Sequence, residues 1–267
     1  MEYEIKRKKT NVEYNSALRV KLIEYLGVNR PAFTSVDQDW CEGFKHFLLS
    51  KVSSNTARGY LQAFNLFLSI AIDKELIFKT PMARVRLPKM QETDCTTLDL
   101  NEIRQLIDTV IDCGGQLKEA FIFSCFTGLR LSDIRKLKWS DISGSNSIVR
   151  PGKTPDKNVY LPLTEQSRLI LDNTERSLTD NRVFWQFNFN RREISYRMLK
   201  WGKKAGLQQR LHFHAGRHTF ATIGLTHDID VYTMKEFLGH SKIDMTMKYA
   251  KIVKSKKDRE ITKFPTL

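Results

Sequence analysis

Residues 238–251 read LGHSKIDMTMKYAK, and they place His240 nine residues before Tyr249 near the end of the chain. The residues between these two offer little that resembles a folding core. A tyrosine near a C-terminus is usually a half-buried packing residue. Whether His240 and Tyr249 have such a packing role or a chemical one depends on which other side chains the sequence provides.

The composition is that of a folded protein with a polyanionic partner. The chain has 267 residues, of which 41% are hydrophobic and 10% aromatic, enough for one large domain or two small ones. Lys and Arg number 44 against 30 Asp and Glu, which gives a net charge of +14. This excess favours nucleic acid, because each cation placed on a phosphate releases condensed counterions. A solvated basic surface is the alternative interpretation.

The sequence predicts a cytoplasmic protein. No apolar run approaches the roughly 18 residues of a membrane span. The N-terminus is charged without a following apolar segment, unlike a secretory signal. None of the four cysteines forms a CxxC pair, and Cys113 and Cys125 lie in or beside apolar helical segments. We therefore expect reduced core thiols rather than a disulfide framework or a zinc site.

The first part of the chain, residues 11–90, is predicted to form helices joined by short turns. The first helix ends at Gly27, and the second has Asp37 as its N-cap. The third runs over residues 53–77 and has one apolar face, formed by Tyr60, Leu61, Phe64, Phe67, Leu68 and Ala71.

Polar residues on the third helix lie away from this apolar face. Thr56, Arg58 and Gln62 are placed there, where they suit contacts with phosphates. Simple solubility of the helix explains the same three residues. The sequence leaves both interpretations open.

A break separates this helical part from a mixed part. Residues 80–97 contain two prolines among mixed polar residues, which is typical of an interdomain linker. Asp99 and Glu102 then have the spacing of a capping box, which predicts the start of another helix. A further apolar helix is expected to stop at Gly128.

Short β-branched segments follow and predict a small antiparallel sheet, with strands at residues 137–142, 146–153 and 158–163. From about residue 164 to Lys251 the chain is expected to be helical again, apart from an interruption at residues 180–189. The predicted fold class is therefore mainly α with a small antiparallel β-sheet.

Two segments in this mixed part carry basic residues of possible chemical use. TGLRLSDIRKL, residues 127–137, puts Arg130 and Asp133 on one helical face, where an exposed ion pair is the simpler explanation. RPGKTPDKNVYLPL, residues 150–163, puts Lys153 in or beside a hairpin turn, where lysines are common for solubility.

A third segment, HFHAGRHTFAT at residues 212–222, puts His214, Arg217 and His218 on one helix. The two histidines are four residues apart, as on a zinc-binding helix. No Glu lies between them, however, and no further ligand pair stands out. We expect no metal and no cofactor here, and we expect His218 to have a structural role.

Taken together, these groups match phosphoryl transfer without a metal. The transition state carries negative charge on the non-bridging oxygens, which guanidinium groups bind in a planar fork. Fixed Arg and His donors supply stabilisation in place of magnesium. A tyrosine is an oxygen nucleophile whose phosphodiester keeps the bond energy, and a lysine or histidine can protonate the departing sugar oxygen.

These segments resemble the motifs of the tyrosine recombinases, the phage-integrase family. The Arg of TGLRLSDI, the Lys of GKT, the His-x-x-Arg of HAGRHTFAT and the final His and Tyr match in order and spacing. The residue sequence FHAGRHTFAT is similar to the corresponding segment in recombinases of Bacteroides-type mobile elements. NTARGYLQAFNLFLSIAIDKELIFKTP resembles the helical, SAM-like core-binding domain that precedes the α+β catalytic domain in this family.

The resemblance implies a role for each matching residue. Tyr249 attacks the scissile phosphate, and Arg130 and Arg217 hold its non-bridging oxygens. His214 and His240 hydrogen-bond the phosphate and assist proton transfer. The general acid is Lys153, with Lys157 four residues away as the less favoured choice. Asp133 braces the region of Arg130 without reacting.

The resemblance also implies an organisation and a partner. Residues 1–83 form the helical core DNA-binding domain, residues 84–97 a linker, and residues 98–267 the catalytic domain with a C-terminal tail. The substrate is double-stranded DNA, bound by a homotetramer that is monomeric in solution. Little room exists before residue 11 for an arm-binding domain, so the chain is either a short family member or a fragment.

Three other functions are alternatives to a site-specific recombinase. A topoisomerase IB-like enzyme that nicks and reseals strands shares the chemistry and differs in needing no paired site. A non-catalytic DNA-binding architectural or regulatory protein is disfavoured by the complete set of six catalytic-type residues. A hydrolytic nuclease lacks the acidic cluster of a two-metal site.

Overall fold

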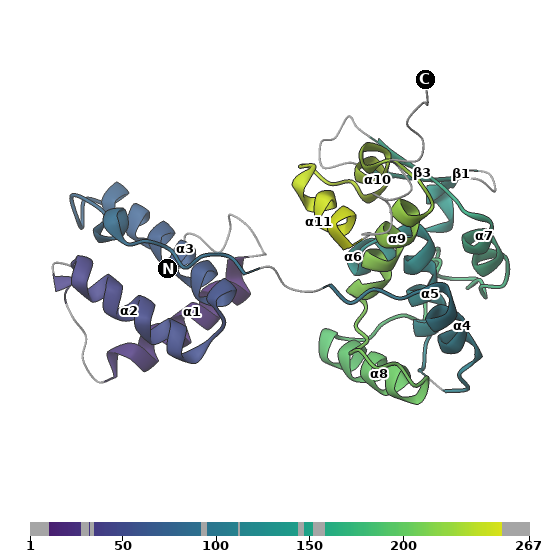
Figure 1. Cartoon of the computed structure of the whole chain (residues 1–267), viewed down its shortest axis with the longest axis horizontal. Helices are drawn as coiled ribbons and strands as arrows, with labels where there is room; N and C mark the ends of the chain where they lie inside the picture. Colours follow the sequence, from purple (N-terminus) through teal and green to yellow (C-terminus); the bar gives the residue numbers. More distant parts are fainter. Residues whose placement is uncertain are drawn as a thin grey trace, which may run out of the picture. The chain divides into compact units, whose positions relative to one another are not determined.

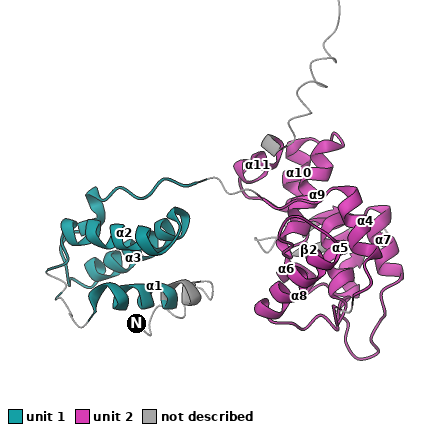
Figure 2. Cartoon of the chain, turned by 60° about the horizontal axis from the view of Figure 1, so that its bottom comes forward, with its two compact units in different colours: residues 1–93 teal, residues 94–267 magenta. Residues whose placement is uncertain are grey.

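The computed structural model describes residues 11–252, except residues 28–31, 33–34, 92–94, 112, 144–146 and 152–157. The chain divides into two compact units, residues 1–93 and residues 94–267, which Figure 2 colours separately. Each unit has its own hydrophobic core. The assignment of residues 84–97 as a linker stays a prediction.

The first unit is helical, and its helices begin and end where the sequence predicts caps. Its elements are α1 (Asn11–Leu26), α2 (Gln38–Lys51), α3 (Ser54–Asp73) and the 3-10 helix η2 (Pro81–Arg84). Gly27 follows α1 with a φ of +58°, a left-handed conformation that glycine adopts without strain. The carboxylate of Asp37 accepts the backbone N–H of Trp40 at 2.8 Å and caps α2.

The core of the first unit is formed by the apolar face predicted for the third helix. Leu61, Phe64, Leu68 and Ala71 are buried, and Tyr60 and Phe67 pack against the same cluster. The helix ends at Asp73 rather than at residue 77, because Glu75 takes a left-handed conformation with a φ of +58°.

The second unit is mostly helical and holds a small sheet. Its elements are α4 (Leu100–Asp108), α5 (Leu117–Thr127), α6 (Leu131–Ile134), the 3-10 helix η3 (Trp139–Asp141), β1 (Ile142–Ser143), β2 (Ser147–Pro151), β3 (Asn158–Pro162), α7 (Glu165–Asp172), α8 (Arg191–Lys204), α9 (His214–Thr226), α10 (Val231–Leu238) and α11 (Asp244–Ile252). The strands pair antiparallel in the order β1-β2-β3. The predicted fold class, mainly α with a small antiparallel sheet, is confirmed.

Two predicted helix boundaries in this unit are confirmed by their hydrogen bonds. Asp99 and Glu102 form the capping box of α4: the Asp99 side chain accepts the Glu102 N–H at 2.8 Å, and the Glu102 carboxylate accepts the Asp99 N–H at 2.9 Å. Gly128 ends α5 with a φ of +66°, as a C-terminal glycine does.

The strand predicted over residues 137–142 is wrong. Half of that segment, Trp139–Asp141, forms η3, and β1 covers only Ile142–Ser143. Lys138 makes an isolated antiparallel bridge with Arg182 instead of extending the sheet. The alternation of apolar and polar residues was misleading here, because residues 137–139 bond to the interruption at 180–189 and only Ile142 joins the sheet.

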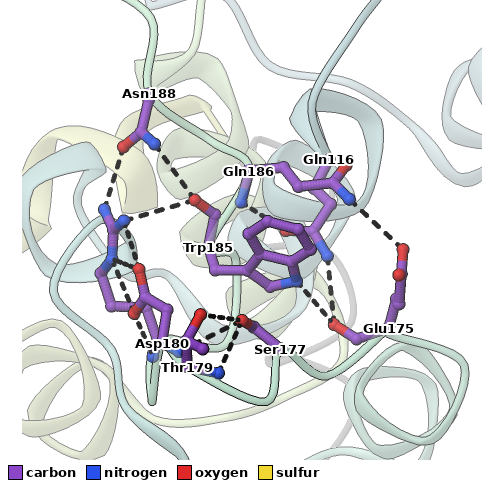
Figure 3. Close-up of polar contacts among 9 residues, drawn as sticks. Gln116, Glu175, Ser177, Thr179, Asp180, Trp185, Gln186 and Asn188 are labelled. Atoms are coloured by element: carbon purple, nitrogen blue, oxygen red, sulfur yellow. Dashed lines mark hydrogen bonds and ion pairs between the residues drawn. The ribbon is translucent and has the colours of Figure 1, made fainter.

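The interruption at residues 180–189 is an ordered loop whose polar groups bond to side chains (Figure 3). Trp185 Nε1 donates to the Glu175 carbonyl at 3.2 Å, and the Gln116 side chain accepts the Gln186 N–H at 3.1 Å. The Arg182 guanidinium donates to the Asp180 carboxylate and to the carbonyl of Trp185. These bonds replace the ladder that a helix or strand would supply.

Helix α9 lies between α5 and α11 in the second unit and also contacts α10 (Figure 1). Its buried residues include Ala215, Gly216, Ala221 and Leu225, which face the apolar residues of the neighbouring helices. This central position puts the His-x-x-Arg segment of α9 against the end of α5 and the end of α10.

Candidate active site

Arg217 is the best-fixed residue of the candidate site. Its side chain is 1% exposed, and its guanidinium donates to the Gly128 carbonyl at 2.7 Å and to the Leu238 carbonyl at 2.6 Å. Gly128 ends α5, and Leu238 is the last residue of α10, where carbonyls lack a partner within the helix. A cation at two helix C-termini is also favoured by both helix dipoles. Arg217 therefore joins three segments of the site.

Arg130 follows Gly128 by two residues and stands at the N-terminus of α6. It is half-buried, and its backbone N–H donates to the Asp133 carboxylate at 3.3 Å. Its positive charge lowers the pKa of His214, of His240 and of Tyr249, so it lies within electrostatic reach of all three. Asp133 thus fixes the backbone from which Arg130 projects.

Tyr249 lies in α11 and is buried, with only 1% of its surface exposed. Its hydroxyl is 2.7 Å from Nδ1 of His218, in α9. Burial raises the pKa of Tyr249 to about 12, although the charges of Arg217 and Arg130 act in the opposite direction. The phenol is therefore protonated at neutral pH and needs a proton acceptor before it can act as a nucleophile.

His240 lies beside Tyr249 and is held by Thr246. Its Nδ1 is 2.7 Å from the Thr246 hydroxyl, and its ring lies nearly parallel to that of Tyr249, with an interplanar angle of 11°. Burial, followed by the charges of Arg217 and Arg130, lowers the pKa of His240 to about 3. The imidazole is neutral in the free protein, and its Nε2 remains for a ligand.

His214 stands at the start of α9 and is exposed. Its ring centroid is 4.5 Å from that of His218, in an edge-to-face arrangement. Desolvation, followed by the charges of Arg217 and Lys248, lowers the pKa of His214 to about 4. Three histidines and three cations therefore lie within electrostatic reach of one another: His214, His218, His240, Arg130, Arg217 and Lys248. A bound anion would relieve the repulsion among the positive charges.

The structure brings together five of the six residues predicted to be catalytic: Arg130, His214, Arg217, His240 and Tyr249. Lys153, and the less favoured Lys157, lie outside the described residues. Among the residues that the structure describes, no group of three His, Cys, Asp or Glu side chains is placed to hold a metal ion.

The residues predicted to contact DNA lie on α3 in the first unit. The Arg58 guanidinium donates to the Pro88 carbonyl at 2.8 Å. The Thr56 hydroxyl is 3.0 Å from that of Ser53, the N-cap of α3, and Gln62 is exposed. Two of these three side chains therefore already have partners within the first unit.

Sequence reasoning missed His218 and Lys248 as neighbours of Tyr249, and Thr246 as the partner of His240. His218 was expected to pack or to hydrogen-bond in a structural role, and its partner proves to be the tyrosine hydroxyl. Lys248 Nζ lies 4.7 Å from the centre of the Tyr249 ring. Its charge lowers the pKa of His214, of His218 and of His240. The only signal for His218 was its i+4 spacing from His214, which first suggests a metal.

The geometry defines a class of site: a buried phenol surrounded by guanidinium and imidazole groups, suited to attack on a phosphate diester. Comparison with known sequences agrees. The chain belongs to the phage integrase family, whose pattern matches residues 96–256, and the phage integrase SAM-like domain matches residues 1–87.

Curated relatives of this chain are tyrosine recombinases. It is 26% identical over 188 residues to tyrosine recombinase XerC of Haemophilus ducreyi, covering 67% of this chain and 62% of the relative. It is 29% identical over 178 residues to tyrosine recombinase XerA of Thermococcus onnurineus, covering 63% of this chain and 62% of the relative. The match thus spans less than two thirds of the length of either relative.

Solved structures share the fold at low sequence identity. A lambda integrase dimer bound to a COC' core site has a TM-score of 0.75 at 17% identity, covering 91% of this chain and 88% of that one. XerH site-specific recombinase bound to palindromic difH substrate has a TM-score of 0.73 at 18% identity, covering 95% and 80%. Within the described residues, no helix is both long and apolar enough to cross a membrane.

Proposed function

We propose that this chain is a site-specific DNA recombinase that cleaves and rejoins strands through a 3'-phosphotyrosine intermediate, without a metal ion or ATP. The observation that carries the proposal is the set of cationic and imidazole groups around the buried Tyr249 hydroxyl. Membership of the phage integrase family supports it.

The proposed reaction begins with attack of Tyr249 Oη on the scissile phosphate. Arg217 and Arg130 hold the non-bridging oxygens, and the contacts of Arg217 with two carbonyls support this role because they fix its guanidinium before the substrate arrives. His240 and His214 donate hydrogen bonds to the same phosphate. Fixed donors of this kind lose no reorganisation energy when charge develops in the transition state.

Departure of the 5'-oxygen requires a proton, and we assign its donation to Lys153, with Lys157 as the less favoured choice. The leaving strand then ends in a free 5'-hydroxyl. Because the phosphotyrosyl ester keeps the energy of the broken phosphodiester, the 5'-hydroxyl of a partner strand can displace Tyr249 without ATP.

The proposed partner is duplex DNA. The net charge of +14 supports it, as does the description of similar structures as complexes with a core site, with difH substrate and with a Holliday junction. Thr56, Arg58 and Gln62 are proposed DNA contacts on α3. We propose that the protomers are monomeric in solution and form a homotetramer on DNA. The lambda integrase tetramer on a Holliday junction supports the tetramer.

Covalent capture in cells tests the proposal. The protein and its Tyr249→Phe variant are expressed beside host DNA, the cells are lysed in denaturant, and DNA attached to the protein is sequenced. We expect one or two discrete sites, recovered only with Tyr249 present. Many scattered sites would instead indicate strand nicking and resealing without a paired site. No attached DNA, and none trapped on nicked suicide substrates, would support a non-catalytic DNA-binding protein.

A further inference from the structure

The hydrogen bond between His218 and Tyr249 has no part in the reaction proposed so far. His218 is 6% exposed and Tyr249 is 1% exposed, so the 2.7 Å contact between imidazole Nδ1 and phenol hydroxyl is shielded from solvent. Building on the proposed function, we propose that His218 is a catalytic residue that accepts the phenolic proton of Tyr249 as this residue attacks DNA.

Geometry favours His218 over the other two histidines as the proton acceptor. Nδ1 of His240 is occupied by the Thr246 hydroxyl, and the ring of His240 lies parallel to that of Tyr249 with 6.5 Å between centroids. His214 is exposed and presents its ring to His218. His218 has its Nδ1 at hydrogen-bond distance from the reacting oxygen, which is the first requirement of a general base.

The proton, bonds and electron pairs of this step balance. Tyr249 Oη gives its proton to Nδ1 of His218 and forms a bond to phosphorus, while the bond from phosphorus to the 5'-oxygen breaks. The leaving 5'-oxygen takes a proton from the general acid, assigned to Lys153. In rejoining, the incoming 5'-hydroxyl returns its proton to the neutral amine of Lys153 and forms a bond to phosphorus. The bond from phosphorus to the tyrosine oxygen breaks, and the imidazolium of His218 returns its proton to Oη.

The charges around His218 couple this proton transfer to the arrival of a phosphate. The groups that face His218 are His214, His212 and Arg217 from its own helix and the segment before it, with Lys248 and Tyr249 from α11. Burial and these positive groups hold the pKa of His218 down to about 3 in the free protein. A phosphate diester bound among the cations raises the basicity of the imidazole, because its negative charge offsets theirs. Tyr249 therefore stays protonated until DNA is bound.

A single-turnover cleavage assay tests the assignment. The substrate is a duplex with the site recovered by covalent capture, made with either an oxygen or a sulfur at the bridging 5'-position. Thiolate is a good leaving group and needs no general acid, so the sulfur substrate isolates the steps at the tyrosine. His218→Asn places an amide near the position of Nδ1 but cannot take up a proton, and His218→Gln leaves that position empty.

We expect His218→Asn and His218→Gln to form covalent DNA about 10²- to 10⁴-fold more slowly than the unmodified protein on both substrates. Lys153→Ala should be slow on the oxygen substrate alone. His227→Asn is the matched control, because His227 is an exposed histidine at the end of the same helix, and it should react at the normal rate. DNA affinity, measured in parallel, should be the same for the unmodified protein and the three histidine variants.

Two results would overturn the assignment while leaving the proposed function intact. One is a His218→Asn variant that cleaves at the normal rate or faster, since His218 would then only hold the tyrosine in place. The other is an unchanged ¹⁵N shift of His218 Nδ1 in the free Tyr249→Phe variant, which would mean that the hydrogen bond does not exist in solution. If the unmodified protein forms no covalent link to DNA, both proposals are overturned together.

Discussion

Replacement of Arg217 tests whether one side chain both stabilises the fold and serves the reaction. Arg217→Ala removes the two hydrogen bonds to the carbonyls of Gly128 and Leu238 from a site where only 1% of the arginine is exposed. A hydrogen bond from a charged donor contributes about 1.5–3 kcal/mol, so the pair contributes about 3–6 kcal/mol. Typical domains have only about 5–15 kcal/mol of unfolding free energy, so the loss is large.

Arg217→Lys gives a graded version of the same test. One ammonium group cannot reach both carbonyls in the fork geometry of a guanidinium. The loss of unfolding free energy should therefore be about half of that expected for Arg217→Ala. Urea unfolding followed by tryptophan fluorescence measures the effect, because Trp139, Trp185 and Trp201 lie in the second unit and only Trp40 in the first.

Arg130→Ala is the matched control for stability. Arg130 is half-buried, and only its backbone makes the contact with Asp133 described above, so its loss should change the unfolding free energy by about 1 kcal/mol or less. Both alanine variants should lose covalent attachment to DNA. An Arg217→Ala protein within 1 kcal/mol of the unmodified one would refute the reasoning that this guanidinium joins α5, α9 and α10.

Three further outcomes are expected. Gly128→Ala should lose about 2–5 kcal/mol of unfolding free energy, since a left-handed alanine costs about 1–2 and overpacking about 1–3 kcal/mol; its Cβ would lie 2.5 Å from Phe220. Urea unfolding at pH 7 and at pH 5 should show that the unfolding free energy falls with acid. His218 and His240 have folded pKa values of about 3, below their ordinary 6.5, so the unfolded chain binds more protons between these two values. Within that range each group lowers the unfolding free energy by about 1.4 kcal/mol per pH unit of acidification. His240→Asn should flatten this slope. Affinity for duplex DNA, measured by fluorescence anisotropy at several salt concentrations, should fall steeply with salt; a flat response would contradict a polyanionic partner.

Local signals in the sequence predicted the helix ends well because caps act over a few residues. Asp37, Asp99 and Gly128 each bond to groups within four positions, so the sequence contains the whole interaction. The strand predicted over residues 137–142 failed for the opposite reason. Its partner is Arg182, more than 40 positions away, and no local pattern reports such a pairing.

The candidate site divides in the same way. Spacing and family resemblance brought forward the six catalytic-type residues, which stay predictions as to their roles. They did not indicate that Arg217 would be buried against two helix ends, or that His218 would meet Tyr249 across 31 positions. Packing of α11 on α9 decides that contact, and packing between helices depends on the whole fold.

The hydrogen bonds at the start of the second unit have a practical consequence. The backbone N–H of Leu98 donates to the buried hydroxyl of Thr219 at 2.9 Å, and the Gln209 side chain donates to the Thr97 carbonyl. Thr219 is two residues beyond Arg217 on α9. A truncated protein that starts at Leu100, where α4 begins, would leave the Thr219 hydroxyl without the Leu98 N–H as its partner, close to Arg217. A fragment intended to keep the active site should therefore begin before Thr97.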